Sequence, residues 1–125
     1  MWYDYIDNPK ALYNLYKEVP PLDDVRIASI HIDDEGNRIV LMFDMPRYPD
    51  FPSPKWGQCN TVTAEIWFTY IAELSINTTS NSYRGYITIE KFAEGLLEVS
   101  IVGNLNVKFI TQSAFIQRIE AYLQG

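Results

Sequence analysis

A chain of 125 residues, 47% of them apolar, is long enough to bury one hydrophobic core, so we expect a single domain over residues 1–125. The formal net charge is −6, and the ten basic residues are scattered singly along the chain. Nucleic acids and anionic membrane surfaces are therefore poor partners, because phosphate binding needs clustered lysine and arginine. The single cysteine, Cys59, excludes an internal disulfide, and the chain opens without a signal-peptide pattern, so a cytoplasmic location is expected.

The first predicted elements are a short helix and a hairpin. Asn8 can cap a helix over residues 9–18, because a proline follows it and apolar residues recur at helical spacing up to a double proline. Residues 25–32 are rich in β-branched side chains and predict a strand, and residues 38–44 predict a second strand antiparallel to it. The turn between the two strands is acidic and rich in turn-forming residues: Asp33, Asp34, Glu35, Gly36 and Asn37.

A proline-rich segment follows the hairpin. Residues 45–57 contain four prolines, which exclude both a helix interior and a central strand, so we expect a stiff, extended loop. The loop carries Tyr48, Phe51 and Trp56. These aromatic side chains suit the anchors of a binding interface, but a loop that folds back over the core, with Trp56 buried, explains them equally well.

The clearest periodic segment is residues 62–76, in which every even-numbered residue is apolar. Such alternation predicts one long strand with a dry face and a wet face. The wet face nevertheless carries Trp67 and Ile71, placed between Glu65 and Glu73. Either this face is open and presents an apolar anchor in acidic surroundings, or another segment covers it.

The rest of the chain predicts three more strands and a helix. Strands are expected at residues 84–91, 96–102 and 105–110, and residues 113–123 show helical spacing of their apolar positions. The predicted fold class is α+β: a curved, six-stranded, mainly antiparallel meander sheet, with an N-terminal and a C-terminal helix packed on one face.

Residues suited to catalysis or metal binding are few. His31, the only histidine, lies beside acids and could act as a general base, but a surface residue at a strand end is the simpler interpretation. Cys59 would need a base nearby to act as a nucleophile. The acids at 33–35 lack the ligand spacing of a calcium loop. We therefore expect no catalytic activity, no metal and no cofactor.

Several short features together form a recognisable layout, in chain order: Asn8-Pro9 with Leu12, Leu15 and Tyr16; Lys55-Trp56; Asn60-Thr61; and Ala121-Tyr122-Leu123. The layout resembles small immunity proteins of bacterial polymorphic toxin systems, in particular the immunity protein 50 family. The resemblance implies a cytoplasmic bacterial protein that binds and blocks a cognate toxin without catalysis of its own. It carries over no binding residues.

The predicted partner is a protein, with a basic toxin domain favoured by charge complementarity. The candidate partner-binding residues, chosen from their chemistry alone, are Asp33, Asp34, Glu35, Tyr48, Phe51, Trp56, Glu65, Trp67, Ile71 and Glu73. The alternative function is a small-ligand-binding module with an aromatic-lined cavity under a curved sheet. A third hypothesis is an enzyme that uses dispersed carboxylates with His31 as base. The oligomeric state is left open.

Overall fold

The computed structural model describes residues 1–125 as one bent antiparallel sheet of eight strands. The strand order across the sheet is β4-β7-β6-β5-β1-β2-β3-β8, so β4 and β8 form its two edges. The strands are β1 (Leu22–Asp33), β2 (Arg38–Asp44), β3 (Thr61–Thr69), β4 (Ala72–Thr78), β5 (Arg84–Ala93), β6 (Leu96–Gly103), β7 (Leu105–Thr111) and β8 (Ser113–Tyr122).

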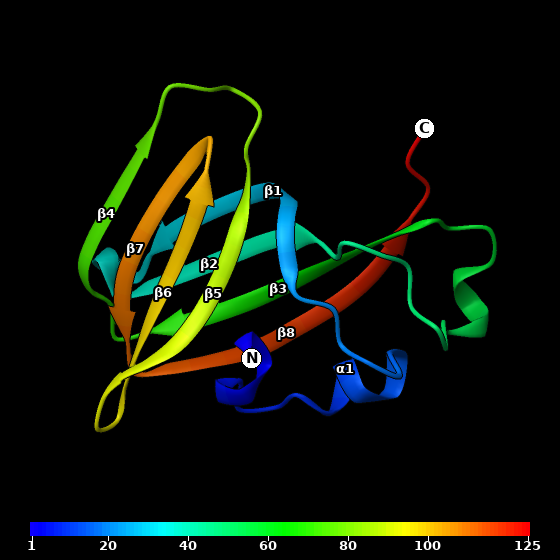
Figure 1. The fold of residues 1–125 in the computed structure, drawn as a ribbon, viewed down its shortest axis with the longest axis horizontal. Helices are drawn as coiled ribbons and strands as arrows, with labels where there is room; N and C mark the ends of the chain where they lie inside the picture. The colour runs from blue at the N-terminus through cyan, green and yellow to red at the C-terminus, as the bar shows by residue number, and fades with distance from the viewer.

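The sheet bends because β1 changes partners along its length. Residues 22–26 pair with β5, and residues 27–33 pair with β2. The first half-sheet is therefore β4-β7-β6-β5, and the second is β2-β3-β8 with the later part of β1 (Figure 1). Side chains from the two halves meet between them, and the rings of Phe68 and Phe109 lie 5.2 Å apart, edge to face. Apolar burial between the halves is the main stabilising contribution.

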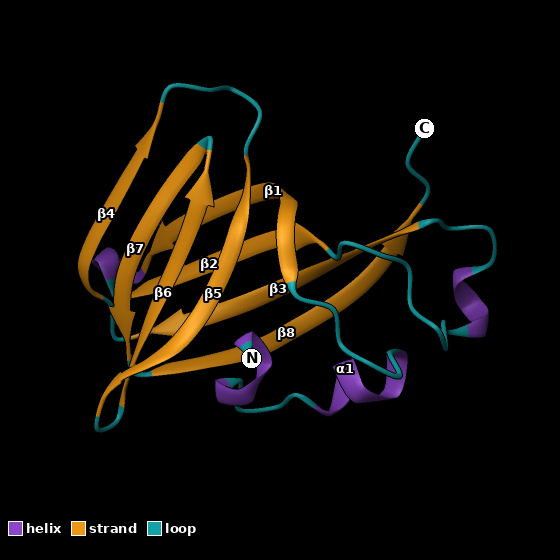
Figure 2. Ribbon diagram, viewed as in Figure 1, coloured by secondary structure: helices purple, strands orange, loops and turns teal.

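The helical segments are short and lie near the N-terminus and in the connections, as Figure 2 shows. They are η1 (Trp2–Tyr5), α1 (Lys10–Leu15), η2 (Asp34–Gly36) and η3 (Pro54–Trp56). Trp2 is buried with its ring 6.3 Å from that of Phe43, and its indole N–H donates to the carbonyl of Pro20 at 2.9 Å. The N-terminal segment thus contributes to the core.

The predicted α+β class with six strands is wrong, because the protein is mostly β. The expected helix at 9–18 is reduced to the six residues of α1. Tyr16 already has extended backbone angles, which allow its hydroxyl to donate to the carbonyl of Arg47 at 2.8 Å. Asn8 makes no capping hydrogen bond to α1.

The expected C-terminal helix at 113–123 is the edge strand β8. A bulge at Gln117 inserts one extra residue opposite β3, which shifts the alternation by one position. The positions that face the core therefore recur at intervals of two, three and two residues, which imitates the spacing of a helix. These positions are Ala114, Ile116, Ile119 and Ala121.

The expected single strand at 62–76 is two strands in different half-sheets. The chain bends at Tyr70, whose φ is +60° and whose N–H donates to the carbonyl of Asn37 at 2.9 Å. Alternation continues through the bend, so the sequence pattern does not reveal it. Leu74 and Ile76, which the pattern assigns to the dry face, are exposed on β4.

The β8 edge is covered by the segment before α1. The N–H of Asp7 donates to the carbonyl of Ala114 at 2.8 Å. The Asn8 amide binds both main-chain groups of Ile116, accepting from its N–H at 2.7 Å and donating to its carbonyl at 2.9 Å. These contacts satisfy main-chain groups that a bare edge would leave open.

Replacing Asn8 tests this covering. Asn8→Ala removes both hydrogen bonds to the partly buried Ile116 main chain, so the free energy of unfolding should fall by about 1–2 kcal/mol. Urea denaturation measures the change. Asn81→Ala, at an exposed loop position, is the matched control and should change stability little. Equal effects of the two substitutions would contradict the role of Asn8.

Candidate functional site

The outward side of the second half-sheet carries three rows of side chains across four strands. Alternate residues of the same strands, such as Ile66 and Phe68, point into the core, so these rows point away from it. We call this surface the Trp67 face. Its rows, read from the strand register, are His31, Val40, Trp67 and Phe115; Ser29, Met42, Glu65 and Arg118; and Asp33, Arg38, Thr69 and Ser113.

Trp67 lies in the central row and is fixed by neighbours from three strands. Its indole N–H donates to Oε2 of Glu65 at 2.6 Å. The guanidinium carbon of Arg38 lies 4.6 Å from the ring centroid, and the Phe115 ring lies 5.6 Å away. Cation–π and aromatic contacts of this kind orient the ring. Trp67 is half-buried because its neighbours on the same face pack around it.

Glu65 is a buried acid on this otherwise outward-facing row, with 8% of its surface exposed. Its second oxygen, Oε1, lies 3.4 Å from Nε of Arg118, and Arg118 also lies 3.5 Å from Glu120. A shallow hollow of about 150 Å³ lies beside the carboxylate. Its lining includes two carboxylates and one guanidinium, from Glu65, Glu120 and Arg118.

The β1–β2 hairpin turn adjoins the Trp67 face through Arg38. Its Nε donates to Oδ1 of Asp33 at 2.7 Å, and this hydrogen bond raises the pKa of Arg38. Asp34 and Glu35 are exposed at the turn, with φ of +53° and +57°. The structure therefore brings together predicted residues from the turn and from β3, and Arg38 links them.

The aromatic residues of the proline segment lie at the other end of β2. Tyr48 and Trp56 are half-buried, with ring centroids 6.4 Å apart, and both pack against the core. Phe51 is 51% exposed. The loop folds back so that Trp56 packs against the core, whereas Phe51 remains at the surface, where a role as a binding anchor stays a prediction. The predicted site residues therefore divide into two separate groups.

The proline segment is fastened to the end of α1. Asp50 accepts from the main-chain N–H of Lys17 at 2.9 Å and pairs with Arg47 at 3.2 Å. Nη2 of Arg47 donates to the carbonyl of Glu18 at 2.7 Å. Burial raises the pKa of the Tyr16 phenol, over which the Arg47 guanidinium lies. The loop is therefore held to the scaffold by hydrogen bonds.

Two of the remaining candidates, Ile71 and Glu73, lie outside both groups. Ile71, in the bend after β3, packs against the core, and Glu73 is exposed on β4. His31 is aligned with Trp67 near the end of β3, whereas Cys59 precedes the start of that strand. A separation of eight residues along an extended chain is roughly 26 Å. No group of three or more His, Cys, Asp or Glu side chains is arranged to hold a metal ion.

The interior does not hold the aromatic-lined cavity of the small-ligand hypothesis. A cluster of 25 buried apolar residues, including Phe43, Phe68 and Phe109, fills the space between the half-sheets. The hollow beside η1, of about 470 Å³, is lined partly by the exposed Met1 and Tyr86. It is a surface groove and not a cavity under the sheet.

Sequence reasoning missed Arg38, Phe115 and Arg118. Arg38 could have been found, because it is the first residue after the turn and pairs directly with Asp33. Phe115 and Arg118 could not be placed while their segment was taken for a helix, since only the β3–β8 register sets them beside Trp67 and Glu65.

A family model settles the class of the protein. The model described as "Immunity protein 50" matches residues 8–122, nearly the whole chain. The chain belongs to the immunity protein 50 family. Membership indicates an immunity protein whose partner is a protein toxin, and it confirms the resemblance found in the sequence.

Other comparisons add the fold alone. The family member is similar to the crystal structure of an uncharacterized protein from Neisseria gonorrhoeae, with a TM-score of 0.51 and 15% identity. The match covers 78% of this chain and 91% of that one. No curated protein matches. None of the helices in this immunity protein is long and apolar enough to span a membrane.

The Trp67–Glu65 hydrogen bond gives a stability prediction. Trp67→Phe keeps an aromatic ring but leaves the buried Glu65 without its N–H donor, so the free energy of unfolding should fall by about 1–3 kcal/mol. Trp56→Phe is the matched control, because Trp56 is also half-buried and its indole N–H has no acceptor comparable to those of Trp2 and Trp67. Equal losses in chemical denaturation would contradict the assignment.

The contacts of Asp50 with Lys17 and Arg47 give a pH prediction. The main-chain N–H of Lys17, and then the Arg47 guanidinium, hold the pKa of Asp50 below its usual value. The contribution of ionised Asp50 to the stability of the fold is therefore complete above the unfolded-state pKa of about 3.9. It is lost as the pH falls through the lower pKa of the folded state. The stability difference between the native protein and Asp50→Asn, measured by urea denaturation, should shrink as the pH falls from 7 to 2. A difference independent of pH would contradict this role.

Proposed function

We propose that this immunity protein neutralises its cognate toxin, in the cytoplasm of the producing cell, by docking the toxin on the Trp67 face. The observation that carries the proposal is the position of Trp67, held by Arg38, Glu65 and Phe115 in the central row of an outward sheet face. Tryptophan, tyrosine and arginine dominate the binding energy of protein interfaces, and they act best near the interface centre.

The charges on and beside the Trp67 face favour a basic partner. Five carboxylates face two guanidinium groups, and both guanidinium groups are already paired with acids. The carboxylates belong to Asp33, Asp34, Glu35, Glu65 and Glu120. An acidic surface attracts a basic toxin domain over long range and suppresses binding of acidic proteins.

The side chains of this face are ordered before any partner arrives. Arg38 of β2 contacts Trp67 of β3, and Trp67 is hydrogen-bonded to Glu65 of the same strand. Glu65 in turn pairs with Arg118 of β8. Side chains that are already fixed lose little conformational entropy on binding. Placement on paired strands, and not on loops, also keeps their relative positions precise.

The proposal is tested by titrating the toxin domain encoded with this protein against surface variants. Trp67→Ala should weaken binding at least 30-fold, from an expected loss of about 2 kcal/mol or more for an anchor residue. Isothermal titration calorimetry measures the affinity. Phe51→Ala, in the proline segment, and Tyr86→Ala, on the other half-sheet, are exposed aromatic controls and should change it little.

Two further results bear on the same proposal. Val40→Lys keeps Trp67 but adds a cation beside it, so it should weaken binding of a basic toxin while leaving the protein folded. The association rate should fall as salt is raised. A toxin that loses affinity with Phe51→Ala or Tyr86→Ala but not with Trp67→Ala or Val40→Lys would place the interface elsewhere.

A further inference from the structure

The hollow beside Glu65 has a lining with spare hydrogen-bond acceptors and a single cation. It is formed by residues of β2, β3 and β8 on the outward side of the second half-sheet, and its volume is about 150 Å³. Liquid water takes about 30 Å³ per molecule, so the hollow has room for the head group of one side chain. The polar side chains of the lining belong to Thr63, Glu65, Arg118, Glu120 and Tyr122.

The two hydroxyl groups of the lining use their only proton on Asp44, a buried acid at the end of β2. Thr63 donates to Oδ1 of this carboxylate at 3.0 Å, and Tyr122 donates to Oδ2 at 2.8 Å. Burial, and then the hydrogen bond to Asp44, raise the pKa of Tyr122, so the phenol keeps its proton at neutral pH. A carboxylate only accepts, which fixes the direction of both bonds. The two hydroxyl oxygens therefore have only lone pairs left for a ligand.

One oxygen of Glu65 receives no hydrogen bond. Oε2 accepts from the indole N–H of Trp67, whereas Oε1 has only an ion pair with Nε of Arg118, at 3.4 Å. Every fully buried side-chain nitrogen or oxygen of the protein has a hydrogen-bond partner, so Oε1 must be open to solvent.

Arg118 does not use up the acceptors around it. Its contacts with Glu65 and Glu120 are 3.4 and 3.5 Å long, and its side chain is 53% exposed. Charge-assisted hydrogen bonds of a guanidinium are about 2.7–2.9 Å long. Arg118 therefore reduces the negative charge of the hollow and leaves the carboxylate oxygens available to a second donor.

We propose that the hollow receives one cationic side chain of the toxin, lysine or arginine, which donates to Oε1 of Glu65 and to the carboxylate of Glu120. This inference rests on the docking of the toxin on the Trp67 face. Ammonium and guanidinium groups carry donors and no acceptor, which matches a lining whose spare groups are acceptors. A neutral amide fits less well, because its own oxygen would face their lone pairs.

Glu65 connects this hollow to the centre of the proposed interface. One carboxylate oxygen holds the Trp67 indole, and the other faces the incoming cation. A partner without a basic residue at this point would cover Glu65 and leave Oε1 without a donor. Covering an unpaired charge lowers affinity, so the hollow selects against such partners.

The first experiment needs no toxin. Butylguanidinium chloride and butylammonium chloride are titrated separately into the ¹⁵N-labelled full chain, and the indole N–H signals of its tryptophans are followed by NMR. The Trp67 signal should shift saturably at roughly millimolar concentrations, because its acceptor Glu65 also binds the added cation. The signals of Trp2 and Trp56 should not move. The cation that acts at the lower concentration identifies arginine or lysine as the better occupant.

Butylurea and sodium chloride are the matched controls for this titration. Butylurea has the shape of the guanidinium compound without its charge, and sodium chloride reproduces the ionic strength. Neither should give a saturable shift of the Trp67 signal.

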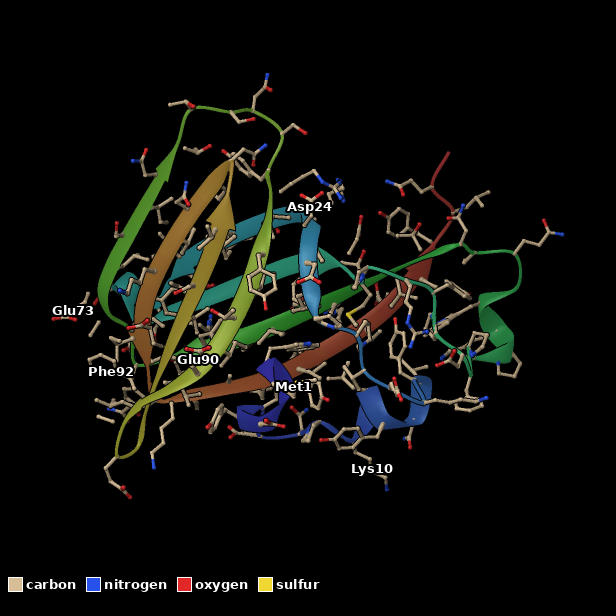
Figure 3. The ribbon with its side chains drawn as sticks, in the orientation of Figure 1. Met1, Lys10, Asp24, Glu73, Glu90 and Phe92 are labelled. Atoms are coloured by element: carbon tan, nitrogen blue, oxygen red, sulfur yellow. The ribbon has the colours of Figure 1, made fainter.

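The second experiment uses Glu65→Gln, which keeps an acceptor for the Trp67 indole but replaces the other oxygen by a donor. The affinities for the added cation and for the toxin, measured by NMR and by calorimetry, should both fall at least tenfold. Glu98→Gln is the matched control and should change neither affinity. Glu98 is a half-buried acid of the first half-sheet, 3.8 Å from Lys108 and aligned with Glu90, which Figure 3 labels.

The results separate this inference from the proposed interface. A native protein whose Trp67 signal does not shift with either cation, or shifts equally with butylurea, would overturn the cation site. A toxin that loses affinity with Trp67→Ala but not with Glu65→Gln or Glu120→Gln, with all variants folded by circular dichroism, would also overturn it and leave the interface in place. An affinity unchanged in all three variants would exclude the interface itself.

Discussion

The change of partner along β1 is the constraint on which the rest of the structure depends. Its first five residues pair with β5 and its remainder pairs with β2, and irregular pairing occurs on both sides of the change. Bulges increase local twist and bend a strand. The bend lets one continuous sheet enclose its own core, with Phe68 of one half against Phe109 of the other. The same bend leaves the opposite faces of both halves directed outward, so a protein with little helix can bury a core and still present a broad ordered surface.

The polar network on that surface is better explained by recognition than by stability. A buried carboxylate such as Glu65 gains from its partners only about what it loses on leaving water, and an apolar residue of similar size often serves stability as well or better. The structure nevertheless places Glu65 beneath Trp67 and beside Arg118. Arg38 joins the same group from β2 and connects it to the acidic turn. Four strands thus contribute to one fixed array of charge and aromatic surface, as expected where an interface needs specificity for one partner.

Alternation and turn residues made much of the sheet predictable. A bend and a bulge in the backbone prevented the prediction of the remaining strands. The β1–β2 hairpin and the β5, β6 and β7 strands follow from alternation and from turns rich in acids or glycine. The bend at Tyr70 could not be predicted, because a residue with positive φ that is not glycine leaves no trace in the pattern. The bulge at Gln117 shifted the alternation of β8 and imitated a helix. The candidate site was limited by the same error: Trp67, Glu65 and Asp33 could be selected from β3 and the turn, but the partners from β8 could not be placed beside them.

The position of β8 has a consequence for how the protein is made. Asn8 and Ile116 are 108 residues apart, so the contact that covers the edge joins two segments far apart in the sequence. Phe115 and Arg118, which complete the Trp67 face, belong to β8, the last strand of the sheet in chain order. A chain that still lacks β8 can form the earlier hairpins. It lacks the Phe115 and Arg118 side chains of the Trp67 face and the edge contacts with Asn8. Contacts so distant in sequence form slowly, because the entropy cost of closing a long loop arises before the contact contributes any stabilising free energy. The time needed to translate β8 and close this loop therefore sets the earliest moment at which a newly made chain presents the complete face.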